Sequence, residues 1–408
     1  MQDGPAILAA EARLQAFTGR STRVGVVLGV GLTLFFSAMV VGTAFVVTSE
    51  DGIRTLTSDF RVFWAAARLM LAGDPLAAFD LARMDAEYNE VTQAWMPWLY
   101  PPGYLVLVAP LGVLPYALAF LVMTLLSVAA MALATRPFAG GAGPVWLAAS
   151  LAPAYLPALI IGQNSLIWLA VLLAALAALR NGRAVLAGVL IGCLTLKPQL
   201  GVMIPIALLA AGQWRVILSA AGTTLLLAAL PTLIVGLDYW PLLSARLAEH
   251  ADRMVHLVSD LELIVGPVGF GTLLGLPTVT ALTLQGVIMA VAALSVAVFW
   301  RSSRIGFDAK AALLLTAILL SAPYLWYYEA AMMPVIGLFL IRAGILGPRW
   351  PGLGLLILLW IGAGLQSMDV LFPLFEDRYF GAALITPVLC LTFALCWAHY
   401  LRAPPSAR

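Results

Sequence analysis

The sequence predicts an all-α polytopic membrane protein, and composition is the first reason. Of the 408 residues, 62% are hydrophobic and only 10% are charged, whereas soluble domains average about 45–50% and 25%. Mean hydropathy is +1.00, so there is too little polar surface to cover a water-soluble core. The formal net charge of +2 gives no basic field for nucleic acid.

Long apolar runs are the second reason. A spanning helix needs about 20 mostly apolar residues. The first such run follows Arg13, Arg20 and Arg23 and lacks a small-residue cleavage site, so we interpret it as a retained anchor with residues 1–23 in the cytoplasm. The full crossings are expected near residues 24–48, 104–134, 144–161, 164–179, 216–236, 281–300, 352–367 and 381–401.

Two further apolar stretches, 184–212 and 311–341, have arginine or lysine near both ends and polar residues in the middle. Each has only about 30 residues, whereas two crossings need about 40. We therefore expect two hairpins of short helices whose apices stop within the outer half of the bilayer. Irregular backbone at that depth must line a protein cavity or water.

The distribution of basic residues sets the orientation. Eight crossings and two hairpins give about twelve helices in one domain, 1–408, with both termini inside and 402–408 as a cytoplasmic tail. Basic residues favour cytoplasmic loops, and 14 of the 22 fall there. These are Arg13, Arg20, Arg23, Arg136, Arg180, Arg183, Arg215, Arg301, Arg304, Lys310, Arg342, Arg349, Arg402 and Arg408. The expected location is the inner (plasma) membrane.

Three segments, 49–103, about 237–280 and 367–381, are then expected outside the cytoplasm. Asp59 to Met70 has apolar residues at helical spacing with Arg61 and Arg68 on the opposite side, which is typical of a helix lying in the membrane interface. Asp80 to Trp95 and Tyr239 to Val258 are further candidate helices. Ionisable groups outside the cytoplasmic loops thus gather on one membrane face, where we expect the chemistry.

Two charged residues have both a structural and a functional interpretation. Asp59 is either part of a helix cap, with Ser58, or a general base at the membrane surface. Lys197, in Lys197-Pro198 at the first apex, either snorkels to the surface or faces a cavity where a phosphate could pair with it.

Two polar groupings are also ambiguous. Gly162-Gln163-Asn164-Ser165 is an ordinary turn or part of a site. Tyr324 to Glu329, at the second apex, contains rings that an aromatic belt explains and a carboxylate that it does not. His250 and His256 are better interpreted as solvated loop residues than as metal ligands, and the three cysteines lie in apolar runs without ligand or disulfide spacing.

In order, these motifs resemble glycosyltransferase family 87, bacterial membrane enzymes of the GT-C superfamily that includes polyprenol-phosphate-mannose-dependent α-mannosyltransferases. The resemblance covers residues 58 to about 334. It is carried by Ser58-Asp59-Phe60, Trp64-Ala65-Ala66, Gly73-Asp74-Pro75, Tyr100-Pro101-Pro102, Gly162-Gln163-Asn164, Gly188 through Lys197-Pro198-Gln199, and Ser321-Ala322-Pro323.

The resemblance implies a GT-C fold with an extracytoplasmic active site. It also implies a lipid-phosphate-sugar donor, a lipid or glycan acceptor, inversion at the anomeric carbon and no required metal or other cofactor. The resemblance further implies that Asp59 is the catalytic base. Many relatives carry histidine where this chain has Tyr327-Tyr328, which departs from the family pattern.

We expect the donor to be bound by Lys197 together with nearby polar and cationic side chains. Cations would stabilise the phosphate that leaves. Competing interpretations are a transporter or flippase, against which no half-protein repeat is found, and a non-catalytic envelope assembly protein. The expected donor-binding residues are Lys197, Gln163, Asn164, Arg61, Arg68, Tyr327, Tyr328 and Glu329.

Overall fold

A computed structural model describes residues 4–19, 58–87, 96–257, 263–371 and 380–404. Within these ranges every regular element is a helix, and the one extended pairing is an isolated bridge between Ile264 and Trp326. The all-α prediction is therefore confirmed for the described part of the chain. The expected first crossing, 24–48, lies outside the described residues.

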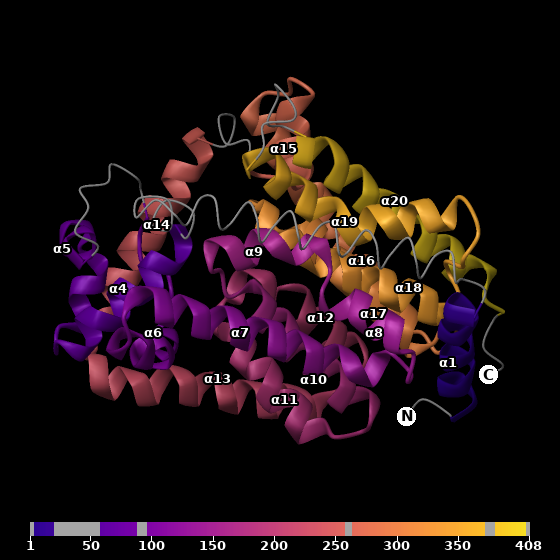
Figure 1. Cartoon of the computed structure of the whole chain (residues 1–408), viewed down its shortest axis with the longest axis horizontal. Coiled ribbons are helices and arrows are strands. Elements are labelled where there is room, and N and C mark those ends of the chain that lie inside the picture. The colour runs from indigo at the N-terminus through magenta and orange to yellow at the C-terminus, as the bar shows by residue number, and fades with distance from the viewer. Residues whose placement is uncertain (1–3, 20–57, 88–95, 258–262, 372–379, 405–408) are drawn as a thin grey trace.

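The described helices pack into one assembly, in which α7 and α13 run roughly along the long axis and α1 lies at one end (Figure 1). The α-helices are α1 (Gly4–Gly19), α4 (Ser58–Leu71), α5 (Leu81–Glu87), α6 (Pro102–Val108), α7 (Tyr116–Thr135), α8 (Gly143–Ser150), α9 (Leu156–Ile161), α10 (Ser165–Arg180), α11 (Ala184–Cys193), α12 (Met203–Ala210), α13 (Trp214–Val235), α14 (Tyr239–Leu257), α15 (Pro267–Leu273), α16 (Thr278–Arg301), α17 (Phe307–Ser321), α18 (Met333–Ala343), α19 (Gly352–Leu371) and α20 (Phe380–Arg402). The 3₁₀ helices used below are η1 (Pro75–Phe79), η2 (Ala109–Val113), η5 (Leu194–Leu196), η6 (Pro198–Leu200) and η7 (Tyr327–Met332).

Five helical stretches in the described residues are long and apolar enough to cross a membrane: Tyr116–Phe138, Gly143–Ile161, Trp214–Val235, Thr278–Arg301 and Gly381–Arg402. This confirms a multi-pass membrane protein. The expected single crossing at 104–134 is wrong, because the chain forms α6 and η2 first and starts α7 only after Pro115. Proline lacks an amide proton and disfavours a helical conformation in the preceding residue, so it separates the two helices.

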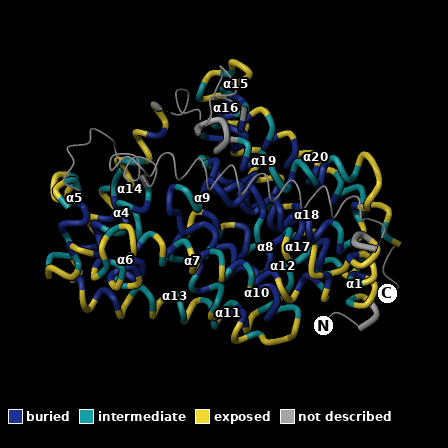
Figure 2. The backbone as a smooth tube through the Cα atoms, in the orientation of Figure 1, coloured by how far each residue is buried: buried dark blue, intermediate teal, exposed yellow. Residues whose placement is uncertain are grey.

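Both expected hairpins contain two short helices around an irregular middle. In the first, α11 and α12 are separated by η5, Lys197 and η6; in the second, η7 lies between α17 and α18. Their depth in the bilayer stays a prediction. Figure 2 shows that α17 and α18 form the buried centre of the molecule, whereas outer helices such as α13 carry many exposed leucines.

Two glycines allow α11 to approach α13 closely. A Cβ at Gly188 would lie 2.5 Å from Ser219 Cβ, and one at Gly192 would lie 2.5 Å from Thr223 Cβ. Small residues spaced by four let helix backbones meet closely inside membranes. This packing fixes the helix that leads directly to Lys197.

The helix expected at Asp59 to Met70 exists as α4, but it is buried on more sides than the pattern predicts, since Val62, Ala65, Ala66 and Leu69 are also buried. Phe60, Phe63 and Ala67 are buried, whereas Arg68 is exposed. The helix expected from Tyr239 is α14, and of the one expected over 80–95 only α5 falls within the described residues. α4 packs against α6, η1 and η2, so its first turn is held by a core of its own.

Candidate active site

Four side chains from distant parts of the sequence form one chain of polar contacts. Asp59 lies in the first turn of α4, and Gln163 lies in the turn between α9 and α10. Gln163 Nε2 donates to Asp59 Oδ2 at 2.8 Å, and Lys197 Nζ lies 3.4 Å from Gln163 Oε1. Lys197 Nζ also lies 3.2 Å from Glu329 Oε1. All four residues come from helix ends or interrupted segments.

The contact between Asp59 and Gln163 depends on Gly162. This residue ends α9 in the left-handed region, with φ +71°, where glycine is favoured. Its α-carbon faces Phe60, since a Cβ at position 162 would lie 2.5 Å from Phe60 Cβ. This close approach brings Asp59, which precedes Phe60, into contact with Gln163, which follows Gly162.

The amide of Gln163 is oriented by its neighbours. Its Oε1 accepts the backbone N–H of Asn164 at 3.0 Å as well as the Lys197 ammonium, so its Nε2 is the atom that faces the carboxylate. Asp59 also lies near the amino-terminal end of α4, where the helix dipole favours a negative charge. The bond from Gln163 thus holds the Asp59 carboxylate in a fixed orientation.

Lys197 does not reach the surface in this structure, since only 2% of the residue is exposed. Its ammonium contacts Ser165 Oγ at 3.1 Å in addition to Gln163 and Glu329, and it lies 5.3 Å from the centre of the Tyr328 ring. An ammonium has three N–H donors. Gln163, Ser165 and Glu329 therefore offer one acceptor for each of these donors.

The second apex contacts the cluster through Lys197, which lies near Glu329 and the Tyr328 ring. Tyr327, Tyr328 and Glu329 are all buried in η7, and the Trp326 and Tyr328 rings stack with an interplanar angle of 5°. The backbone before η7 is held by the segment after α14, because Val265 N donates to Leu325 O and Tyr327 N donates to Leu263 O. An interfacial aromatic belt does not account for this buried position.

Sequence reasoning missed the part that Tyr100 and Tyr239 play. Burial, with Tyr104 and the Asp59 carboxylate, raises the pKa of Tyr100 well above its ordinary value, and a hydrogen bond with Gln163 opposes that rise. Tyr239 donates its hydroxyl to Tyr100 O at 2.9 Å and accepts from Trp98 Nε1 at 2.6 Å. Tyr100 was visible only as part of a proline-rich turn, and no local signal connects it with Tyr239.

Of the two outer arginines, Arg68 is held away from this cluster by its own partners. Arg68 pairs with Glu87 at 2.6 Å and lies over the Trp64 ring. Burial raises the pKa of the Asp85 carboxyl, and the positive charge of Arg61 opposes the rise. A contact between Arg61 and the donor stays a prediction.

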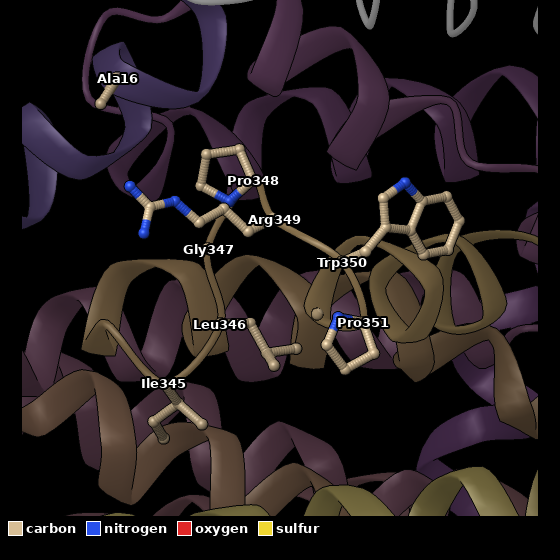
Figure 3. Close-up of a pocket in the computed structure, with 9 residues that line it drawn as sticks. Ala16, Ile345, Leu346, Gly347, Pro348, Arg349, Trp350 and Pro351 are labelled. Carbon is tan, nitrogen blue, oxygen red and sulfur yellow. The ribbon is translucent and has the colours of Figure 1, made fainter.

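A separate pocket of about 540 Å³ lies between α1 and the turn from α18 to α19 (Figure 3). Arg349 and Trp350 belong to its lining, and none of the residues in the polar cluster does. Among the described residues, no group of three or more His, Cys, Asp or Glu side chains is arranged to hold a metal ion.

Fold and site together define a multi-pass membrane protein, helical throughout its described residues, in which Glu329, Gln163 and Lys197 form a buried polar cluster at helix ends. Residues 98–323, more than half of the chain, match the family model described as glycosyltransferase family 87. The chain belongs to that family and is a membrane glycosyltransferase. Gln163, Asn164 and Lys197 lie within the matched range, whereas Asp59 and Glu329 lie outside it. No curated protein and no solved structure matches the chain.

Proposed function

We propose that this glycosyltransferase moves mannose from a polyprenyl-phosphate donor to a hydroxyl of a lipid or glycan acceptor, with inversion. The reaction takes place at the extracytoplasmic face of the inner (plasma) membrane, within a single GT-C domain. The observation that carries the proposal is the continuous contact from Asp59 through Gln163 to Lys197. The Gln163 amide contacts the proposed base, Asp59, through its nitrogen and the proposed phosphate-binding cation, Lys197, through its oxygen.

Asp59 is the proposed general base. An ionised carboxylate only accepts hydrogen bonds, so Asp59 is a group that can take up the proton of an acceptor hydroxyl. That hydroxyl oxygen attacks the anomeric carbon while the bond from this carbon to the phosphate oxygen breaks. One base is enough, because the phosphate leaves as an anion and needs no proton.

Lys197 is the proposed contact to the donor phosphate. The ammonium is buried and already faces an anionic group, Glu329, at 3.2 Å. The donor phosphate takes the place of one of its present contacts, and the lysine charge then stabilises the negative charge that grows on the leaving oxygen. Tyr327 and Tyr328 border this end of the site, and the polyprenyl tail lies among lipid-facing helices.

The substitution Asp59→Asn tests the proposal. Asparagine keeps the size of the side chain but does not take up a proton, so turnover should fall by about 10²–10⁴-fold. Donor binding should persist, because the base acts on the acceptor. The measurement is transfer of radiolabelled mannose from polyprenyl-phosphate-mannose by the purified protein, together with equilibrium binding of the donor.

Asp80→Asn is the matched control. Asp80 is a carboxylate that does cap a helix, since its Oδ1 accepts the backbone N–H of Ala82 at 2.9 Å. Asparagine and aspartate are comparable N-caps, so this variant should keep its turnover. Near-normal turnover of Asp59→Asn would show that Asp59 is structural as well.

A further inference from the structure

Two buried polar atoms beside the polar cluster have no hydrogen-bond partner among the described residues: Tyr104 Oη and Asn164 Oδ1. Both residues are buried, with 5% and 7% of their surface exposed. A side-chain hydrogen-bonding interaction links Tyr104 and Asn164, but neither Tyr104 Oη nor Asn164 Oδ1 has a partner at full hydrogen-bond distance and angle. Buried polar atoms are normally paired, so two neighbouring exceptions require an explanation.

Asn164 has an obvious structural use that it does not make. It occupies the N-cap position of α10, and its carbonyl accepts the N–H of Trp168 at 3.0 Å. An asparagine there normally turns its side-chain oxygen onto the first N–H groups of the helix. No such side-chain bond is present, and the Asn164 side chain interacts with Tyr104 instead. Capping therefore does not explain this asparagine.

We propose that Tyr104 and Asn164 form a subsite that recognises one hydroxyl of the donor sugar. A hydroxyl donates one hydrogen bond and accepts others, so it can donate to Asn164 Oδ1 while it accepts from the Tyr104 hydroxyl. An ionised phosphate only accepts and cannot satisfy the amide oxygen. The inference rests on the proposed function, and it adds Tyr104 as a residue that determines sugar specificity.

The position of the pair favours the donor sugar. Asn164 directly follows Gln163, whose amide joins the proposed base to the proposed phosphate contact. In an inverting displacement the reacting sugar lies between these two groups, beside the turn that carries Asn164. A sugar hydroxyl at this point is held near its own anomeric carbon.

Aromatic rings complete the subsite. The Tyr104 ring lies 4.6 Å from that of Tyr100, 5.4 Å from that of Phe63 and 5.9 Å from that of Trp98, measured between centroids. Such rings offer apolar faces to the C–H groups of a sugar. Tyr100 is partly exposed and packs on Tyr104.

Two measurements on Tyr104→Phe test the subsite. The first compares kcat/KM of wild type and variant for polyprenyl-phosphate-mannose and for donors lacking one sugar hydroxyl at a time. The variant should lose about 5- to 100-fold with the intact donor, because a buried donor-sugar group is left unsatisfied. With the donor that lacks the recognised hydroxyl, wild type and Tyr104→Phe should have equal kcat/KM. An equal loss with every donor, or no loss with the intact one, overturns the proposal.

The second measurement is the melting temperature of the ligand-free protein in detergent. If the Tyr104 hydroxyl waits for a ligand, Tyr104→Phe removes an unsatisfied group and should leave Tm unchanged or raise it. Tyr155→Phe is the matched control, because the Tyr155 hydroxyl donates to Ala149 O at 2.5 Å and its loss should lower Tm. An equal fall in Tm for Tyr104→Phe overturns the subsite. This result stands even if wild type fails to use the mannosyl donor, which would refute the proposed function alone.

Discussion

The close contact at Gly162 makes the geometry of the site testable by adding a single methyl group. In Gly162→Ala, the new Cβ would lie 2.5 Å from Phe60 Cβ and 3.0 Å from Phe120 Cε2. To reach the 3.4 Å at which ordinary contact begins, Phe60 must recede by about 0.9 Å. Asp59 precedes Phe60 in the same helix, so its 2.8 Å bond to Gln163 is stretched by a similar amount.

Two costs follow from this shift. A misplacement of about 1 Å can reduce catalysis by about 10²-fold, which is the fall in turnover expected for Gly162→Ala. Stability falls as well, because a left-handed backbone costs a non-glycine residue about 1–2 kcal/mol and overpacking adds about 1–3 kcal/mol. The assays are mannosyl transfer at saturating donor and thermal unfolding in detergent.

Gly182→Ala separates the two costs. Gly182 has almost the same backbone angle, φ +72°, but nothing lies within 4 Å of the position that its Cβ would take. This variant should lose stability through backbone strain alone and keep its turnover. If Gly162→Ala transfers sugar as fast as Gly182→Ala, the close approach of α4 does not position Asp59 and the reasoning is wrong.

Three further predictions concern charge and orientation. Lys197→Ala should weaken donor binding strongly and Lys197→Arg should retain part of it, measured by equilibrium binding; unchanged affinity in the alanine variant would make the lysine structural. In a cysteine-free background, Ala82→Cys should react with a membrane-impermeant thiol reagent in intact cells and Asn181→Cys only after lysis, and the reverse pattern would overturn the orientation. Arg342 Nε donates to Asp308 Oδ1 at 2.9 Å in a buried pair, so Asp308→Ala should lower the free energy of unfolding by about 3–5 kcal/mol. The double variant Asp308→Leu with Arg342→Met should recover much of this loss in thermal unfolding. Failure to recover would point to a role beyond the pair.

The sequence was sufficient to find the individual polar residues of the site. Asp59, Lys197 and Glu329 stood out because a charge beside or within apolar helices is costly unless it is paired or functional. Their mutual contacts were not predictable, because no periodicity relates residues that lie more than a hundred positions apart. For the same reason, the bond from Tyr239 to the backbone of Tyr100 had no signal in the sequence.

Local patterns predicted where helices form, but not always which residues those helices contact. The helical spacing of apolar residues in α4 correctly identified Phe60, Phe63 and Ala67 as buried. It did not reveal that Arg68 pairs with Glu87. Hydropathy alone also joined α6 to α7, although Pro110 and Pro115 were visible in the run. Hydropathy averages over such residues, whereas the backbone responds to each one.

The pairing of Lys197 with Glu329 has a consequence for biosynthesis. Well over a hundred residues separate the two, and translation at about 5–20 residues per second means that Lys197 precedes its partner by on the order of ten seconds. During that interval the segment from α11 to α12 folds around an ammonium that has Gln163 and Ser165 beside it but no counter-charge from η7. A chain that stalls before residue 329 would therefore present a membrane quality-control protease with an unneutralised lysine at a break between two helices.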